Sequence, residues 1–258
     1  MCYDIKASVE SQLKRAERKG DRKAVNEIME RLVPLTDLPL FHAMGFDHPS
    51  LLIYTDRSPE FPEVATWGLI PHWVRDEAQM KKTWNSTLNA RGETIFEKNS
   101  FRSAAKKSRC LIYVDGFYEH HHFNKETYPF FIHRKDKEPM ILAGLYNEWN
   151  NPDTGGKLTS FSIVTTTGNS MMGQIHNNPK LDGPRMPVIL PDELADKWLI
   201  EYKDELDKRS IQELLREYPA TELSAYTVDK LRGKNSKGNS EEASKPFYYA
   251  ELPELEFE

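Results

Sequence analysis

Hydrophobic positions near the start of the chain repeat at the spacing of an amphipathic helix. Between residues 8 and 32, apolar side chains lie three and four positions apart on both sides of Gly20 and Asp21, within a highly charged background. This spacing predicts two short helices. From residue 34 to residue 66 the apolar residues instead form short runs separated by Pro, His, Asp and Ser, which favours strands and turns.

Most of the remaining chain shows the same strand-like pattern. Strands are predicted at CLIYVDGFYEHHHF (110–123), YPFFIHR (128–134), MILAGLYNEW (140–149) and SFSIVTTTG (160–168). Helices are predicted at 100–107, in PDELADKWLI with Pro191 near its start, and in SIQELLREY with Ser210 as N-cap. Because strands follow one another without regular helical crossovers, we expect an α+β fold with a mainly antiparallel, barrel-like β-sheet and peripheral helices.

The C-terminal segment differs in composition from the rest of the chain. Residues 233–246 form a polar, low-complexity stretch typical of a linker, and the following FYYAELPELEFE combines acidic and aromatic residues. This end either packs on the body or extends into solvent. We therefore expect one domain over residues 1–232, with a helical insertion at about 8–32, followed by a polar linker and acidic tail over 233–258.

Composition is that of a globular protein with a core of its own. Of the 258 residues 38% are apolar, including 12 Phe and 11 Tyr, which is enough to bury a core without disulfides or metals. No apolar run approaches the roughly 18 residues of a membrane span, and the N-terminus is charged where a signal peptide would be apolar. We expect a cytoplasmic protein. The two cysteines, Cys2 and Cys110, form neither a disulfide framework nor a zinc motif.

The formal net charge of -5 argues at first against nucleic acid as a partner. The charge is unevenly distributed, however. Residues 240–258 hold six acids and one Lys, which accounts for the whole -5, whereas residues 75–109 hold nine Lys or Arg against four Asp or Glu. A basic stretch on a neutral body is compatible with DNA binding. We expect the acidic tail to compete with DNA for the basic region.

Cys2 becomes the N-terminal residue when the initiator methionine is removed, as is normal before a small residue. Its amine, with an ordinary pKa of about 8, and its thiol, with one of about 8.5, would then sit on adjacent carbons. Such an aminothiol condenses with an aldehyde to an imine, and the thiol closes on the imine carbon to give a thiazolidine. The thiol could instead attack an amide. A second residue without a role is the alternative.

Three further blocks carry polar residues suited to chemistry. NARGET provides the amide of Asn89 and the guanidinium of Arg91, which can fork onto a phosphate. Glu119 ends an apolar strand beside aromatic residues, where desolvation would raise its pKa toward neutrality. His176 is the best candidate among the eight histidines for moving a proton. A structural role is the alternative for each.

A histidine tract and a tryptophan-containing motif have the composition of ligand sites. The tract 120–122 consists of three histidines, but no HExxH or paired CxxC accompanies it, so we expect no metal and no organic cofactor. In WGLIPHW, Trp67 and Trp73 could offer an apolar platform for an unstacked base. Packing in the core is the equal alternative for either ring.

Taken together and in this order, the blocks resemble the SRAP family of SOS response-associated peptidase-like, abasic-site processing proteins. The resemblance rests on an ordered set of motifs: Met-Cys at the start, WGLIPHW (67–73), NARGET (89–94) with a following Phe101-Arg102, RCLIYVDGFYE (109–119), AGLY (143–146), IVTT (163–166), IH (175–176) and RMPVIL (185–190). It covers most of the chain. It implies a barrel-like α+β fold with a positively charged cleft for single-stranded DNA.

The resemblance also implies a reaction and a role for each matching residue. Cys2 would attack the ring-opened aldehyde of an abasic site and form a thiazolidine DNA-protein crosslink that shields the lesion. Asn89 would hydrogen-bond the amine or the sugar, Glu119 would carry the proton, and His176 would assist opening of the deoxyribose. DNA contacts would come from Arg91, Arg102, Arg185, Trp67, Trp73 and Thr165.

The chain departs from the family pattern at several positions. Tyr3 and Asp4 replace the common Gly-Arg pair after Met-Cys, so a basic contact is missing there, and His120 stands where Trp is common. Residues 177–184 separate His176 from Arg185, which could displace that arginine from its phosphate. The segment 8–32 replaces a shorter stretch in many relatives.

The resulting expectation is a DNA-repair enzyme that acts on abasic sites in single-stranded DNA. A cysteine-type peptidase that removes its own N-terminal Met, and a non-covalent reader of modified or single-stranded DNA, remain the alternatives. The expected protein is a monomer, associated with the nucleoid when bound to DNA and open to replication-associated protein partners.

Overall fold

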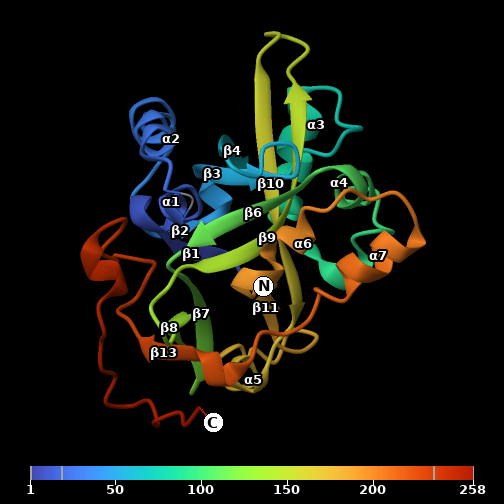
Figure 1. Cartoon of the computed structure of the whole chain (residues 1–258). Helices are drawn as coiled ribbons and strands as arrows, with labels where there is room; N and C mark the ends of the chain where they lie inside the picture. The colour runs from blue at the N-terminus through green and yellow to red at the C-terminus, as the bar shows by residue number, and fades with distance from the viewer. Residues whose placement is uncertain (1, 19, 235, 258) are drawn as a thin grey trace.

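The fold is built from two β-sheets that share a boundary at residues 114–116 (Figure 1). The structure is a computed structural model, and it describes residues 2–18, 20–234 and 236–257. Strand β6 of the first sheet ends at Val114, and β7 of the second begins at Gly116, so a single residue, Asp115, connects them. Glu119 follows this junction on β7.

Five strands of the first sheet close into a barrel. Neighbouring pairs run β3–β4, β4–β10, β10–β9, β9–β6 and β6–β3, which completes a ring. The barrel strands are β3 (Ser50–Thr55), β4 (Glu63–Trp67), β6 (Arg109–Val114), β9 (Met140–Asn150) and β10 (Lys157–Thr167). Three short strands attach to it: β5 (Asn89–Arg91), β11 (Arg185–Pro187) and β12 (Ile189–Leu190).

The second sheet has the order β13-β8-β7-β1-β2, and its neighbouring strands are antiparallel throughout the described residues. Its strands are β1 (Asp4–Ala7), β2 (Leu40–Met44), β7 (Gly116–Phe123), β8 (Glu126–Arg134) and β13 (Leu223–Thr227). Because only β4 and β5 pair in parallel, both with β10, the expected α+β fold with a mainly antiparallel, barrel-like sheet is confirmed.

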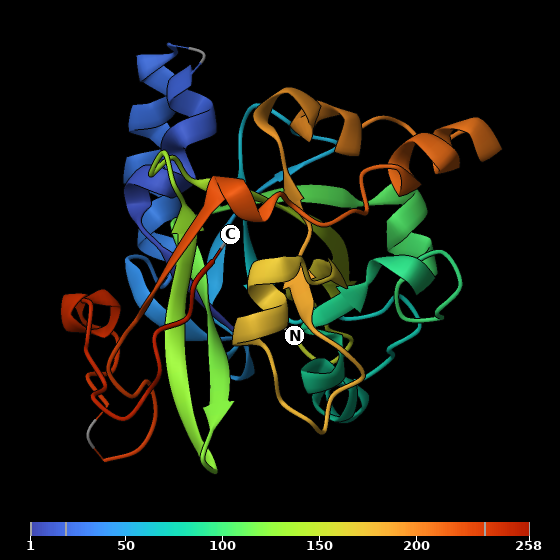
Figure 2. The same cartoon turned by 90° about the horizontal axis from the view of Figure 1, so that it is seen from below.

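Helices surround the sheets, with α1 and α2 along one side and α6 and α7 along another (Figure 2). They are α1 (Val9–Arg18), α2 (Arg22–Glu27), α3 (Glu77–Thr83), α4 (Arg102–Lys107), α5 (Ser170–Ile175), α6 (Ala195–Trp198) and α7 (Glu205–Gln212). The two helices expected within 8–32 are confirmed. Ser210 as an N-cap is wrong: Asp204 caps α7 with a capping box, and Ser210 lies inside the helix.

The C-terminal tail packs on the body. Tyr249 is buried, its ring meets that of Tyr128 edge-on at 5.0 Å, and its hydroxyl donates to the carbonyl of Val228 at 2.9 Å. Phe257 contacts the ring of Phe130 on β8 in the same way. Figure 1 shows this segment running down beside β13 and β8. Tyr249 and Phe257 of the tail therefore pack on the core, whereas Phe247 and Tyr248 are exposed.

Candidate active site at the start of the chain

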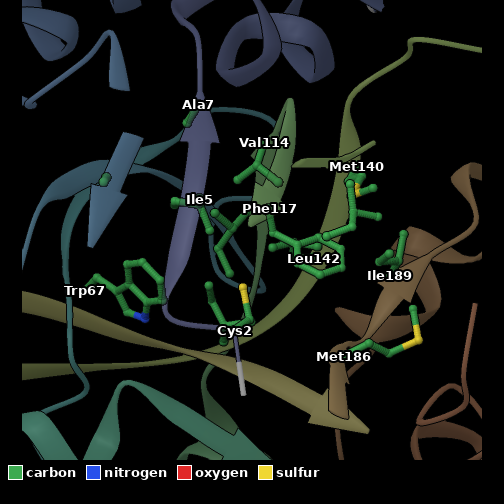
Figure 3. Packing of buried hydrophobic residues seen from close by; sticks show 14 of the residues in the cluster. Cys2, Ile5, Ala7, Trp67, Val114, Phe117, Met140, Leu142, Met186 and Ile189 are labelled. Atoms are coloured by element: carbon green, nitrogen blue, oxygen red, sulfur yellow. The ribbon is translucent and has the colours of Figure 1, made fainter. Parts of the chain in front are cut away.

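Pairing between β1 and β7 brings the first residues of the chain to Glu119. Asp4 lies opposite Tyr118 in this antiparallel pair, so the residues before Asp4 run alongside the segment that contains Glu119. Cys2 is fully buried, among Ile5, Trp67 and other core residues shown in Figure 3. Burial raises the pKa of the Cys2 thiol, and the nearby Glu119 carboxyl raises it further. The predicted removal of Met1 lies outside the described residues.

Asn89 holds the backbone of Cys2 in place. Its side-chain nitrogen donates to the carbonyl oxygen of Cys2 at 2.8 Å. Asn89 begins β5, which pairs in parallel with β10 and places Asn89 opposite Ile163. The Oδ1 atom of the same amide is buried, and no donor for it is found in the described part of the chain. It is therefore free to accept a hydrogen bond from an incoming group.

Glu119 has the electrostatic character expected of a group that moves protons near pH 7. The residue lies on β7 and is only 6% exposed. Desolvation raises the pKa of its carboxyl to about 7. The sequence-based expectation of a raised pKa is therefore confirmed, and at neutral pH both protonation states are populated.

His176 faces Glu119 from the end of α5. Its Nε2 lies 3.9 Å from Oε2 of Glu119, and its Nδ1 accepts the backbone N–H of Arg185 at 3.0 Å. Nδ1 also lies 3.2 Å from the carbonyl oxygen of Arg185, so the backbone of Arg185 holds this edge of the ring while Nε2 faces the carboxyl. Burial lowers the pKa of His176 to about 4, so the ring is neutral at physiological pH.

A pocket of about 400 Å³ opens beside these groups. Glu119 and His176 both line it. The other lining residues come from the N-terminus, the β7–β8 hairpin, the loop after His176 and the segment after β13: Tyr3, His120, His122, Thr127, Pro129, Asn178, Leu181, Lys230, Leu231 and Arg232. The site thus combines the start of the chain, a carboxyl with a pKa near neutrality and a cavity large enough for part of a ligand.

The Arg185 side chain is buried, and its hydrogen-bond partners lie within the protein. Its guanidinium pairs with both carboxylate oxygens of Glu93, at 2.6 and 2.9 Å, and donates to the carbonyl of Thr165 at 2.9 Å. Thr165 itself is fully buried. The loop 177–184 does not separate Arg185 from His176, because the backbone of Arg185 contacts the ring. In this structure Arg185 contacts the ring of His176 through its backbone and Thr165 on β10 through its guanidinium. The expectation that Arg185 and Thr165 bind DNA stays a prediction.

Trp67 is likewise a core residue. Its ring is fully buried, stacks on Phe161 with centroids 6.3 Å apart, and donates from Nε1 to the carbonyl of Leu88 at 2.8 Å. It ends β4 and packs in the core, as the packing alternative expects, whereas a role as a base platform stays a prediction for Trp67. Trp73 is only partly buried and packs against a separate cluster formed by residues such as Met80 and Trp149.

Of the basic residues, Arg91 and Arg102 are exposed and Arg109 is not. Arg91 ends β5, two residues after Asn89, and Arg102 begins α4. Arg109, counted in the basic stretch, is fully buried and donates to the carbonyls of Ala105 and Trp198. The charge available to a phosphate near the site is therefore smaller than the sequence count indicates.

Comparison with known proteins agrees with this geometry. A family model described as SOS response associated peptidase (SRAP) matches residues 14–234. The chain belongs to the SRAP family. It is 40% identical over 193 residues to the abasic site processing protein YoqW of Bacillus subtilis, covering 74% of this chain and 80% of that protein. It is 32% identical over 163 residues to the abasic site processing protein HMCES of Xenopus tropicalis, covering 56% and 46%.

A solved structure shows the same SRAP architecture. The crystal structure of a protein from Bacteroides thetaiotaomicron superposes with a TM-score of 0.81 at 33% identity, over 96% of this chain and 100% of that chain. A protein from Bordetella bronchiseptica, at 23% identity and a TM-score of 0.69, shares the fold.

Two functional candidates in this SRAP chain escape sequence analysis. Asp4 is buried and held by His42, whose Nε2 donates to Oδ1 at 2.9 Å, and by Arg232, whose Nη2 donates to both carboxylate oxygens at 2.9 and 2.7 Å. Arg232 is 228 positions away from Asp4, and no local pattern links the two. The basic residue missing at position 4 is thus replaced in space by one from the other end of the domain.

Among the described residues, no cluster of three or more His, Cys, Asp or Glu side chains has a geometry that could hold a metal ion. Within the same residues, no helix is long and apolar enough to cross a membrane.

Proposed function

We propose that this protein processes abasic sites in single-stranded DNA by forming a thiazolidine crosslink through Cys2 after removal of Met1. The observation that carries the proposal is Glu119, a buried carboxyl with a pKa of about 7, next to a chain end whose second residue is cysteine. The names of the relatives, abasic site processing proteins, point to the same substrate.

The chemistry follows from the aminothiol. The Cys2 amine adds to the aldehyde carbon of the ring-opened sugar and forms a carbinolamine. Protonated Glu119 gives its proton to the hydroxyl, which leaves as water, and the resulting iminium returns its N–H proton to the Glu119 carboxylate, so that an imine and a protonated Glu119 remain. The Cys2 sulfur then adds to the imine carbon, and its proton ends on the ring nitrogen. One C–N and one C–S bond form, one water is released, and no electron acceptor is needed.

The raised thiol pKa fits this order of events. Because burial keeps the Cys2 sulfur protonated, the amine is the first nucleophile, and the thiol reacts only once the imine is close to it. Asn89 fixes the Cys2 backbone and offers Oδ1 to the amine or a sugar hydroxyl. His176 faces Glu119 with Nε2 and would assist opening of the sugar.

The DNA contacts, location and domain limits form the remainder of the proposal. Exposed Arg91 and Arg102 would bind phosphates, and Trp73 would lie along the strand. The functional domain would span 1–232, with residues 233–258 as linker and tail, in a monomer without metal or cofactor. Cytoplasmic location, association with the nucleoid and contact with replication proteins follow from a DNA substrate.

The test is crosslinking to single-stranded DNA that contains one natural abasic site. Wild-type protein should give a product that survives denaturation, and Cys2→Ala should give none. Cys110→Ala is the matched control, because Cys110 is equally buried but lies within β6 and carries no free amine, and it should crosslink like wild type. Crosslinking by Cys2→Ala would remove the aminothiol from the mechanism.

The two alternatives give different outcomes in companion assays. A peptidase would cleave unrelated peptides in a library, whereas the proposed protein should cleave nothing beyond its initiator Met. A non-covalent reader would bind the DNA and leave no product after denaturation. Retained Met1, measured by mass spectrometry of the intact chain, would block the amine and exclude the thiazolidine for that preparation.

A further inference from the structure

The pocket beside Glu119 has more room than a sugar without a base requires. Its volume is about 400 Å³, and Pro129, Leu181 and Leu231 contribute apolar surface to it. A ring-opened deoxyribose is small and polar, so it would leave most of this surface uncovered. The same pocket is lined by Tyr3, whose ring packs on Phe46 with centroids 5.0 Å apart. Apolar and aromatic walls of this kind suit a nucleobase.

Arg232 gives this pocket a cation with free donors. A guanidinium has five N–H groups. Nη2 donates to both oxygens of Asp4, and Nε contacts Sδ of Met44 at 3.1 Å. Within the described part of the chain, Nη1 has no hydrogen-bond partner, and the side chain is 51% exposed. The guanidinium is therefore anchored on one edge and open on the other.

Asp4 sets the position of that guanidinium. The carboxylate is buried on β1, two residues after Cys2, and it also accepts from His42. Burial alone would raise the pKa of Asp4, but the hydrogen bond from His42 and the charge of Arg232 lower it below its ordinary value. Asp4 is thus ionised at neutral pH. Because it is tied to β1, it fixes Arg232 relative to the nucleophile.

Lys230 is less suited to the same role. Its Nζ donates to the carbonyl of Thr127 and lies 4.8 Å from the ring centroid of Tyr128. It also lies 3.8 Å from a carboxylate oxygen of Glu126. These contacts hold the ammonium group, whereas Arg232 keeps an unused edge. A planar guanidinium with two open N–H groups also matches a phosphate better than an ammonium does.

We propose that Arg232 binds the phosphate of the nucleotide next to the abasic site, while the apolar part of the pocket receives that nucleotide's base. This inference deepens the proposed function and rests on it. Arg232 joins the N-terminal strand to the segment after β13, so both ends of the domain form one subsite beside the reacting sugar. The Arg232 side chain binds the strand and fixes its position relative to Cys2, and it takes no part in forming covalent bonds.

The first experiment measures equilibrium binding without chemistry. Single-stranded DNA with one tetrahydrofuran residue, which has no aldehyde, is bound to wild type, Arg232→Gln and Arg31→Gln. Arg31 is the matched control, an exposed arginine paired with Glu27 on the helical insertion. Arg232→Gln should bind about tenfold more weakly, with the slope of log Kd against log salt reduced by about 0.7. Arg31→Gln should match wild type.

The second experiment locates the phosphate. A neutral methylphosphonate replaces one linkage at a time on either side of the tetrahydrofuran residue. At one linkage adjoining the lesion, the replacement should weaken wild type about tenfold and leave Arg232→Gln unchanged. Equal penalties in both proteins at every linkage, or unchanged binding by Arg232→Gln, would overturn the inference.

A second variant separates phosphate binding from a structural effect. Asp4→Asn keeps an acceptor for Arg232 and removes the competing charge, so it should bind at least as tightly as wild type and retain the position-specific penalty. If Asp4→Asn binds as tightly as wild type but shows no weakening at that linkage, Arg232 does not bind the phosphate there, and the inference is overturned. Wild type that fails to crosslink natural abasic DNA contradicts the proposed function, whereas crosslinking with no Arg232 effect contradicts only this inference.

Discussion

At the scale of single residues, the raised pKa of Glu119 suits proton transfer but lowers the stability of the folded protein at neutral pH. A carboxyl with a pKa of about 7 in the folded protein and about 4.3 when unfolded binds its proton more tightly in the folded state. Stability therefore falls as the pH rises from about 4 to about 7, and the lost part amounts to about 3 kcal/mol above pH 7. The folded protein tolerates this because the carboxyl stays available for proton transfer.

Glu119→Gln should remove that pH dependence. The amide cannot ionise, so the stability of the variant relative to wild type should increase by about 3 kcal/mol between pH 4 and pH 8. Urea unfolding of both proteins at the two pH values measures the difference. Crosslinking by the variant should be slow at every pH, because Gln cannot give a proton to the departing hydroxyl. A constant stability difference between pH 4 and pH 8 would show that Glu119 titrates normally.

Residue roles were only partly accessible from the sequence. Glu119 could be predicted because an apolar strand with aromatic neighbours indicates burial, and burial determines the direction of its pKa shift. Trp67 could not, because the WGLIPHW motif does not reveal that β4 closes a barrel around it. The Asp4–Arg232 pair could not either, since its members meet only after β1 and the segment following β13 have assembled.

At the scale of elements, the turn from β6 into β7 aligns the site. Gly116 begins β7, and a Cβ added there would lie 2.3 Å from the carbonyl oxygen of Ile132 and 2.7 Å from the ring of Phe131. The absence of a side chain lets β8 approach β7 closely. Since Glu119 follows three residues later on the same strand, this close approach fixes the carboxyl relative to the chain end.

Gly116→Ala should therefore impair both stability and chemistry. Ile132 contributes backbone to β8 and cannot move aside cheaply, so we expect a loss of about 2 kcal/mol in the free energy of unfolding and slower crosslinking. Gly173→Ala on α5 is the control, because its Cβ would meet nothing within 4 Å and alanine favours helix. Denaturant unfolding and single-turnover crosslinking measure the two effects. Wild-type values for Gly116→Ala would show that β7 adapts freely.

Strand periodicity predicted most elements, yet it could not predict that five of the strands close into a barrel. The run at 140–149 is apolar on both faces because alternate side chains of β9 pack in two different core clusters. The β9–β10 pair joins adjacent segments, whereas the β6–β9 and β4–β10 pairs join segments separated by other strands, and local pattern carries no information about those pairs. Helix caps were also less certain, since both Ser210 and Asp204 are good capping residues and only the packing of α7 decides between them.

At the scale of the whole molecule, the acidic tail is part of the fold. None of the tail residues 247–257 lines the pocket that contains Glu119 and His176. The tail instead packs Tyr249 and Phe257 on β8, and its Glu256 carbonyl accepts from Gln174 on α5. The expected competition between tail and DNA for the cleft is not supported by this placement.

Removing the tail should consequently lower the free energy of unfolding without increasing the affinity for single-stranded DNA. Truncation after Pro246 deletes buried Tyr249 and the contacts of Phe257, and should cost about 3 kcal/mol, measured by urea unfolding. The control keeps those contacts and changes Glu251, Glu254 and Glu256 to Gln. Its stability should stay within about 0.5 kcal/mol of wild type. Its affinity for single-stranded DNA should change less than about twofold at 0.15 M salt, where charges more than about 8 Å from the DNA are screened. A much tighter complex of this variant would instead mean that the tail occupies the path of the strand.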